Sequence, residues 1–166
     1  MTIENYIAYF ETAATNHKLI LHNSPNKHFC KVRVQEVLTS LRKDIHFPAV
    51  VAELPEIYTE DRLSDNYRDI LLGAVLILKP VPPTDYDAEI QVINTCVEIA
   101  KDFRTKIMND RRKGNLKGLD ANRFKIVEVG PVFNNLYGAR LEFQFDEPTR
   151  MALDENKWNG ETKFSI

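Results

Sequence analysis

Four histidines have the most versatile chemistry in this chain, because imidazole binds metals and exchanges protons near neutral pH. Three of them, His17, His22 and His28, fall within twelve positions, and His46 follows later. Spacings of five and six residues do not place two ligands on one helix face, a Ser-Pro pair separates the last two, and HExxH is absent. We therefore interpret these histidines as surface or loop-packing residues and expect no metal site.

A second group of candidates is acidic, and paired carboxylates can act as general acid and base when their environments separate their pKa values. Most of this group falls in a polar stretch between two apolar runs, where solvent keeps the pKa values of carboxylates close to their usual values. The stretch therefore predicts a solvated connection rather than a catalytic pair. The group consists of Glu53, Glu56, Glu60, Asp61, Asp65 and Asp69.

The remaining sequence patterns give equally weak support for a reactive or ligand-binding site. Cys30 and Cys96 have apolar or helical surroundings and are interpreted as small buried residues, with no support for a disulfide. No GxSxG occurs, and GNLKG lacks the phosphate-loop pattern GxxxxGK[ST]. The basic run RRKG, with Lys117 and Arg123 nearby, is better explained as a solvated helix end than as a nucleic-acid contact. We expect no enzyme activity, catalytic residue, cofactor or bound metal.

Bulk composition narrows the class of protein. The chain has 166 residues, which predicts a single domain over 1–166. Hydrophobic residues make up 43% and charged residues 28%, as in an average globular protein. The net charge of -2 argues against a general nucleic-acid binder, and the longest apolar run, 70–78, is too short to span a bilayer. The start lacks a signal-peptide pattern, so we expect a cytoplasmic protein that contacts neither membrane nor nucleic acid.

Hydrophobic periodicity predicts the elements that position these residues. Thr2 can cap a first helix, whose apolar positions are Ile3, Ile7, Phe10 and Ala14. The segment 29–43 begins like a strand and continues like a short helix. Residues 47–58 and 67–79 read as two strands of a hairpin with a long polar connection, and 67–79 is apolar enough to be covered on both faces.

The second half of the chain contains the most regular pattern. Thr84 or Asp85 can cap a long helix with an apolar stripe at Tyr86, Ile90, Ile93, Val97, Ala100, Phe103 and Ile107. Residues 123–133 and 139–145 then read as a final hairpin. The order of elements predicts an α+β fold with an antiparallel or mixed four-stranded sheet and helices mainly on one face. A ferredoxin-like βαββαβ arrangement is the alternative. Residues 147–166 form a C-terminal extension whose Trp158 and Phe164 pack on the body or on a neighbour.

The insert NNLYG in VGPVFNNLYGARLEFQF has the composition of a turn. Asn134, Asn135 and Gly138 tolerate left-handed backbone, so they account for a chain reversal. Leu136 and Tyr137 then lie at a loop tip, where a plain hairpin needs no large apolar side chain. They either fold back onto the core or contact another chain, because exposed apolar groups mark interfaces.

One family resemblance adds a functional expectation. The run DNYRDILLGAVLILKP, the amphipathic helix after it and VGPVFNNLYGARLEFQF resemble small tail-completion proteins of phages and phage-derived contractile particles, which are similar to tail terminators. The likeness covers about residues 47–145 and rests on element order and one hairpin style. It implies a structural protein that forms a ring, hexameric by analogy, on tail tube or connector proteins, in the cytoplasm during assembly and then in the particle.

The interface expected from this resemblance consists of Asn134, Asn135, Leu136, Tyr137 and Arg140. Two other functions stay open at the level of sequence. One is a ferredoxin-like binding or regulatory module that works as a dimer, and the other is a metal-dependent hydrolase that uses the histidines with nearby acids.

Overall fold

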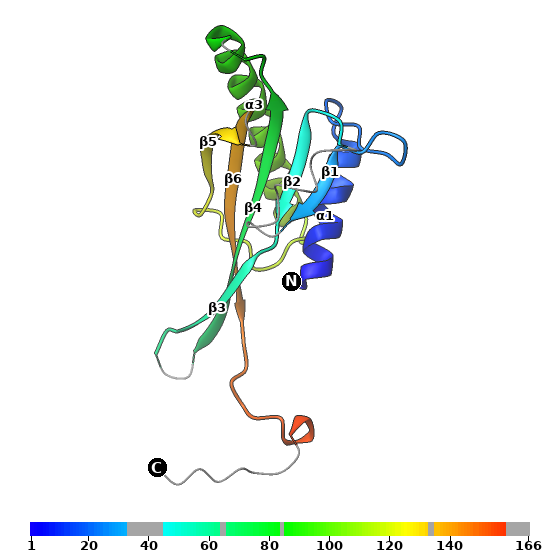
Figure 1. The fold of residues 1–166 in the computed structure, drawn as a ribbon. Helices are drawn as coiled ribbons and strands as arrows, with labels where there is room; N and C mark the ends of the chain where they lie inside the picture. The colour runs from blue at the N-terminus through cyan, green and yellow to red at the C-terminus, as the bar shows by residue number, and fades with distance from the viewer. Residues whose placement is uncertain (33–44, 64–65, 84, 133–134, 159–166) are drawn as a thin grey trace.

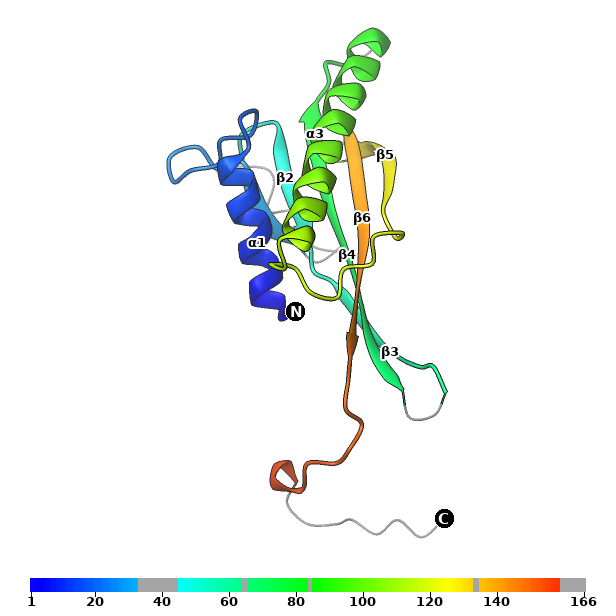
Figure 2. The same cartoon turned by 180° about the vertical axis from the view of Figure 1, so that it is seen from behind.

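The computed structural model describes residues 1–32, 45–63, 66–83, 85–132 and 135–158. Within these ranges the chain is an α+β protein in which two long helices, α1 and α3, lie on the same face of a six-stranded sheet (Figures 1 and 2). The strand order is β1-β2-β4-β6-β5, and β3 also pairs with β4. The sheet is mixed, because β1 runs parallel to β2 while the other pairs are antiparallel. The predicted class is confirmed, whereas four strands were too few.

Helix α1 (Ile3–Asn16) begins where the sequence predicted, because the Thr2 hydroxyl accepts a hydrogen bond from the Asn5 amide at 3.2 Å. Tyr6, Phe10 and Ala14 lie on its buried side. The Tyr6 hydroxyl donates to the carbonyl oxygen of Ala74 at 2.9 Å, which ties the helix to the middle of the sheet.

The predicted strand 47–58 is two strands. β2 (Ala49–Glu53) and β3 (Glu56–Asp61) are separated at Leu54 and Pro55, since proline cannot donate to a strand ladder. Both pair in succession with the long β4 (Tyr67–Pro80), whose apolar residues are buried on both faces as predicted. The polar connection between the hairpin strands is therefore shorter than expected, because β3 continues to Asp61.

β1 (Phe29–Val32) confirms the strand half of the segment 29–43, and the predicted helix after it lies outside the described residues. β1 and β2 are direct parallel neighbours. In a ferredoxin-like split βαβ unit, a third strand separates the two parallel strands. The ferredoxin-like alternative is therefore wrong for this topology.

Helix α3 (Tyr86–Arg112) has an N-cap at Asp85, whose carboxylate accepts from the Ala88 amide at 2.9 Å. Its predicted apolar stripe is correct from Val97 onward, since Val97 packs against the core and Ala100, Phe103 and Ile107 are buried. The first turns project past the sheet in Figure 1, so Tyr86 and Ile90 remain 78% and 60% exposed. The buried side there is formed by Val92, Cys96 and Ile99.

The last hairpin joins β5 (Lys125–Val132) to β6 (Leu136–Pro148), so β6 begins three residues earlier than predicted. Gly138 lies inside this strand and does not have a left-handed backbone. A Cβ at Gly138 would lie 1.8 Å from the carbonyl oxygen of Ile77, which shows that glycine is needed for close approach of β6 to β4.

The sheet has two different faces. The face under α1 and α3, called the helix face, carries the main core, including Phe10, Phe103 and Phe143. The opposite face, called the second face, carries a smaller apolar cluster of Val32, Val51, Leu76, Leu78 and Leu136. This division follows from the alternation of side chains along each strand.

Part of the sheet extends well beyond the helices. Figures 1 and 2 show β3, the adjoining half of β4 and the end of β6 running past α1 as one projection, which we call the arm. In the arm, residues 67–72 of β4 pair with β3 on one side and with residues 144–148 of β6 on the other. The extension after β6 contains a short 3-10 turn, η1 (Glu155–Lys157), and exposes Met151, Leu153 and Trp158. Trp158 therefore does not pack on the body, and Phe164 lies outside the described residues.

Candidate interaction surface

The expected hairpin-tip residues do not form an exposed tip. Leu136 and Tyr137 are the first two residues of β6 and point to opposite faces of the sheet. Leu136 is only 6% exposed and belongs to the apolar cluster of the second face, while Tyr137 is partly buried against the main core. The alternative in which both side chains fold back onto the core is therefore the correct placement. Asn135 is exposed, and Asn134 lies outside the described residues.

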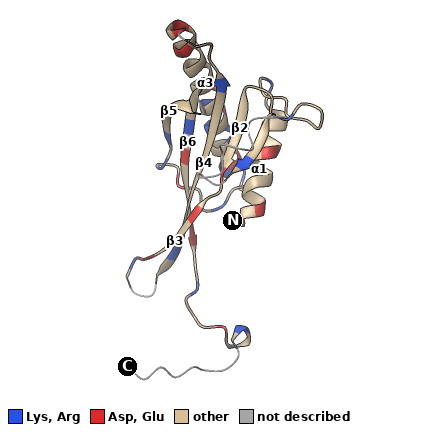
Figure 3. Ribbon diagram, viewed as in Figure 1, with Lys and Arg blue, Asp and Glu red and all other residues tan. Residues whose placement is uncertain are grey.

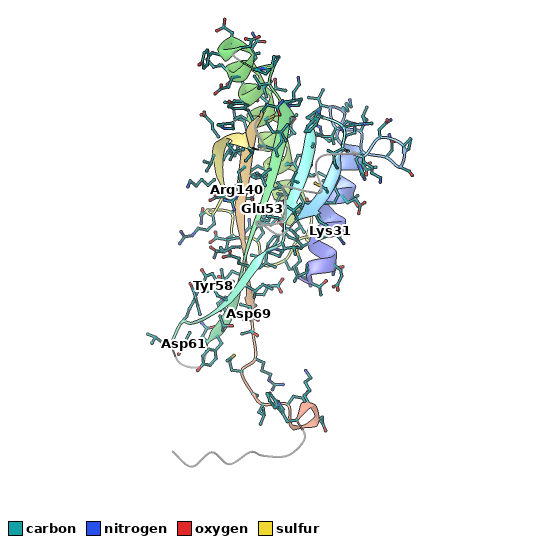
Figure 4. All side chains as sticks on the ribbon, viewed as in Figure 1. Lys31, Glu53, Tyr58, Asp61, Asp69 and Arg140 are labelled. Carbon is teal, nitrogen blue, oxygen red and sulfur yellow. The ribbon has the colours of Figure 1, made fainter. Side chains whose placement is uncertain are left out.

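Arg140 lies four residues further along β6, at the centre of the second face, as Figure 4 shows. Its guanidinium donates to the Glu53 carboxylate from Nε at 3.0 Å and from Nη2 at 2.7 Å, and it also contacts Glu142. Hydrogen bonding to Glu53 raises the pKa of Arg140, so the guanidinium stays charged. This geometry places Arg140 in an intramolecular network. It also corrects the interpretation of Glu53, which ends a strand and is buried instead of lying in a solvated connection.

Beside this network the second face is hollowed. A groove of about 540 Å³ runs from Glu53 and Arg140 to Leu72 and Gln144 of the arm, with Lys125 at its rim. Its lining mixes charged, polar and apolar groups. Arg140 engages Glu53 and Glu142, while Glu56, which also lines the groove, is exposed and forms no ion pair with a described residue.

The arm carries apolar side chains in solvent. Ile57 is 53% exposed, Tyr58 43% and Leu63 78%. Ile57 lies opposite Leu71 on the helix face of the arm, and Tyr58 lies opposite Ile70 on the second face. Exposed apolar groups that gather on a projection, instead of being scattered singly, are typical of contact surfaces.

Ion pairs hold the arm in place. Asp146 of β6 binds Arg68 of β4 and accepts from Arg62 Nη2 at 2.7 Å. Partial burial acts to raise the pKa of Asp146, but the two arginines outweigh it and hold the pKa below its usual value. Asp69 accepts a hydrogen bond from the Thr59 hydroxyl at 2.6 Å, which adds a second cross-strand link. The arm is therefore a braced element of the fold.

The histidines have structural partners. His22 Nδ1 accepts from the His28 amide at 3.0 Å, and His28 Nδ1 donates to the carbonyl oxygen of Pro48 at 3.0 Å. His17 lies 3.3 Å from Asp102, and the ring of His46 packs beside His28. These contacts are the kind expected of histidines that pack against loops. No cluster of three potential metal ligands occurs among the residues that the structure describes.

The cysteines agree with their predicted roles. Cys96 lies on the buried side of α3, and burial raises the pKa of its thiol to about 11. Cys30 on β1 is partly buried and its pKa is likewise raised to about 11 by burial. Both are free thiols, and the elevated pKa values keep them protonated at neutral pH.

Sequence reasoning included Ile57 and Tyr58 in one strand over 47–58 and assigned the charged run after Tyr58 to a loop. It therefore missed that a separate strand begins after Pro55 and continues to Asp61. None of the helices in the described ranges combines the length and apolar character that a membrane span requires. Comparison with protein-family models, with curated proteins and with solved structures found no match in any of the three.

Proposed function

We propose that this protein is a non-enzymatic assembly subunit that associates with copies of itself into a ring on a phage tail or tail-like particle. Tail tube or connector proteins are its proposed partners. The arm is the observation that supports this proposal. It projects from a well-packed body, is braced by Asp146, and presents Ile57, Tyr58 and Leu63 to solvent.

The exposed part of the arm contributes little to the stability of the folded chain. Its exposed apolar side chains bury little surface within the monomer, so they contribute little to folding. Burying such a side chain against a partner stabilises association by about 1.5–3 kcal/mol for each large residue. A braced projection also loses little conformational entropy on binding, because its strands are already ordered. These properties suit a contact element.

Light scattering after size exclusion, over a range of protein concentrations, tests self-association. We expect an oligomer of defined size, and a ring in negative-stain images. The variant Ile57→Ser/Tyr58→Ser should shift the population toward monomer with an unchanged circular dichroism spectrum, because both side chains are exposed.

A matched control has the same chemistry at the other end of the molecule. Tyr86→Ser/Ile90→Ser also replaces an exposed tyrosine and isoleucine, at the projecting end of α3. This control should assemble like the unmodified protein. A strict monomer at high concentration that also fails to bind tail tube protein contradicts the proposal, and a stable dimer that binds small molecules points instead to a regulatory module.

A further inference from the structure

Charge is distributed very unevenly along this chain. Between Lys101 and Lys125 the sequence holds nine basic and three acidic residues, a net charge of +6. Since the whole chain carries -2, the rest of it carries -8. Such asymmetry inside one chain indicates a surface that recognises opposite charge.

The positive residues lie on the outer side of α3 and on the loop after it. We call this set the basic surface, and all its members are exposed and form no ion pair with a described residue: Arg104, Arg111, Arg112, Lys113 and Lys117. The three acids of this stretch are already engaged, Asp102 by His17, Asp110 by Lys106 and Asp120 by Arg123. The positive charge of the basic surface is therefore not neutralised by the residues around it.

The basic surface also contains a depression. Arg104 and Arg112 border a depression of about 410 Å³ on α3, and Met108 lines it between them. A partly buried methionine adapts to the shape of an apolar side chain. The depression thus offers one apolar contact flanked by two guanidinium groups.

The arm carries the opposite, negative charge. In Figure 3 acidic segments mark β3 and the end of β6. Residues 56–69 contain five acids and two arginines, and both arginines bind Asp146. Glu56 and Glu60 flank Tyr58 on the second face of β3, because side chains alternate along the strand. Glu56 is exposed and forms no ion pair with a described residue, and Glu60 lies 3.5 Å from Arg62. Figure 4 shows Tyr58 on the arm.

We propose that the arm of one copy docks on the basic surface of a second copy, with Tyr58 against the Met108 depression and Glu56 and Glu60 facing its arginines. The inference rests on the proposed self-assembly and names its contact surfaces. An arm-to-arm contact brings the acids of two copies together and is disfavoured by repulsion. Pairing of two different surfaces is heterologous, and such contacts generate closed rings or open filaments instead of a two-fold dimer.

Charge reversal with rescue is the experiment. We take Glu56→Lys/Glu60→Lys as the arm variant and Arg104→Glu/Arg112→Glu as the surface variant. Each alone should reduce assembly at least tenfold in light scattering, because each places like charges across the contact. An equimolar mixture of the two variants should recover association, since both contacts between unlike variants join opposite charges: the reversed arm meets the reversed surface, and the unmodified arm meets the unmodified surface.

The control is Glu4→Lys/Asp87→Lys, which changes the net charge as the arm variant does but at exposed positions outside both surfaces. It should assemble normally. Raising the salt concentration of the unmodified protein from 0.05 to about 0.5 M should weaken association about tenfold, because the contact charges are exposed and screened.

The outcomes separate this inference from the proposed function. An oligomer that tolerates salt and both reversals overturns the docking inference and leaves assembly intact. A monomer under all conditions overturns both. Binding of a fluorescent DNA duplex that the surface variant loses, with assembly unchanged, assigns the basic surface to nucleic acid and also overturns the inference.

Discussion

The network of Glu53 and Arg140 allows one quantitative prediction about the second face of the sheet. We consider Arg140→Met, Glu53→Gln and the combined variant. The two side chains share three hydrogen-bond distances of 2.7, 3.0 and 3.2 Å. The Glu53 side chain is 11% exposed and that of Arg140 is 33% exposed, so this pair lies between a surface and a buried ion pair.

The two single variants should differ in cost. Removing Arg140 leaves the buried Glu53 carboxylate without its cation, and loss of one partner from a buried pair costs about 3–5 kcal/mol. Partial exposure of the site reduces this to about 2–3 kcal/mol, because surface pairs contribute only about 0–1 kcal/mol. Glu53→Gln should cost about 1 kcal/mol, since the amide still accepts a hydrogen bond and Arg140 keeps Glu142 and solvent.

Urea unfolding followed by circular dichroism measures these free energies. The double variant should cost less than the sum of the singles by about 1 kcal/mol, because the two side chains interact directly. Arg62→Met is a matched control: Arg62 is more exposed, and its partner Asp146 keeps Arg68, so the loss should stay below about 1 kcal/mol. Equal costs for the two single variants, or additive costs in the double variant, refute the argument from burial.

Two further predictions concern stability. Gly138→Ala should cost about 3 kcal/mol or more in urea unfolding, because its Cβ would lie 1.8 Å from the backbone oxygen of Ile77, whereas Gly114→Ala meets open space and carries only the strain of φ 79, about 1 kcal/mol. Burial acts to raise the pKa of Asp110, but hydrogen bonds from Lys106 and Tyr9 and the charges of Lys106 and Lys113 together outweigh it, and the folded-state pKa is lowered. Its stabilisation is therefore complete above the unfolded-state pKa of about 3.9 and is lost as pH falls toward the folded-state pKa, so thermal melts of Asp110→Asn should lack part of the acid sensitivity of the unmodified protein.

The sequence predicted the elements better than their partners. Thr2 and Asp85 as caps, α1, β4 and the position of α3 were all recoverable, because they depend on local chemistry and on periodicity. The apolar stripe of α3 was wrong at Tyr86 and Ile90. Periodicity records which side of a helix is apolar, and only the tertiary structure records where the supporting sheet ends.

The arm illustrates a different limit. The polar stretch after Tyr58 matched a loop because its charges dominate the composition, yet β4 runs alongside it and β3 stays paired with β4 as far as Asp61. Such a stretch forms a strand because a neighbouring strand pairs with it, and the local sequence does not record that neighbour. β-propensity therefore depends on tertiary context. For the same reason the charged residues of the arm were read as a solvated connection.

The insert NNLYG shows how one signal can have two meanings. Glycine between polar residues suggested a turn, but an apolar alternation runs backward without interruption through Phe145, Phe143, Leu141, Ala139 and Tyr137. That period of two extends the strand across Gly138, where a second role of glycine applies, the close approach of two backbones. Once Leu136 and Tyr137 are strand residues, strand geometry places one on each face and both contact the core. Ile57 and Tyr58 of the arm are exposed, whereas Leu136 and Tyr137 are not, so a partner is better sought on the arm than at the final hairpin.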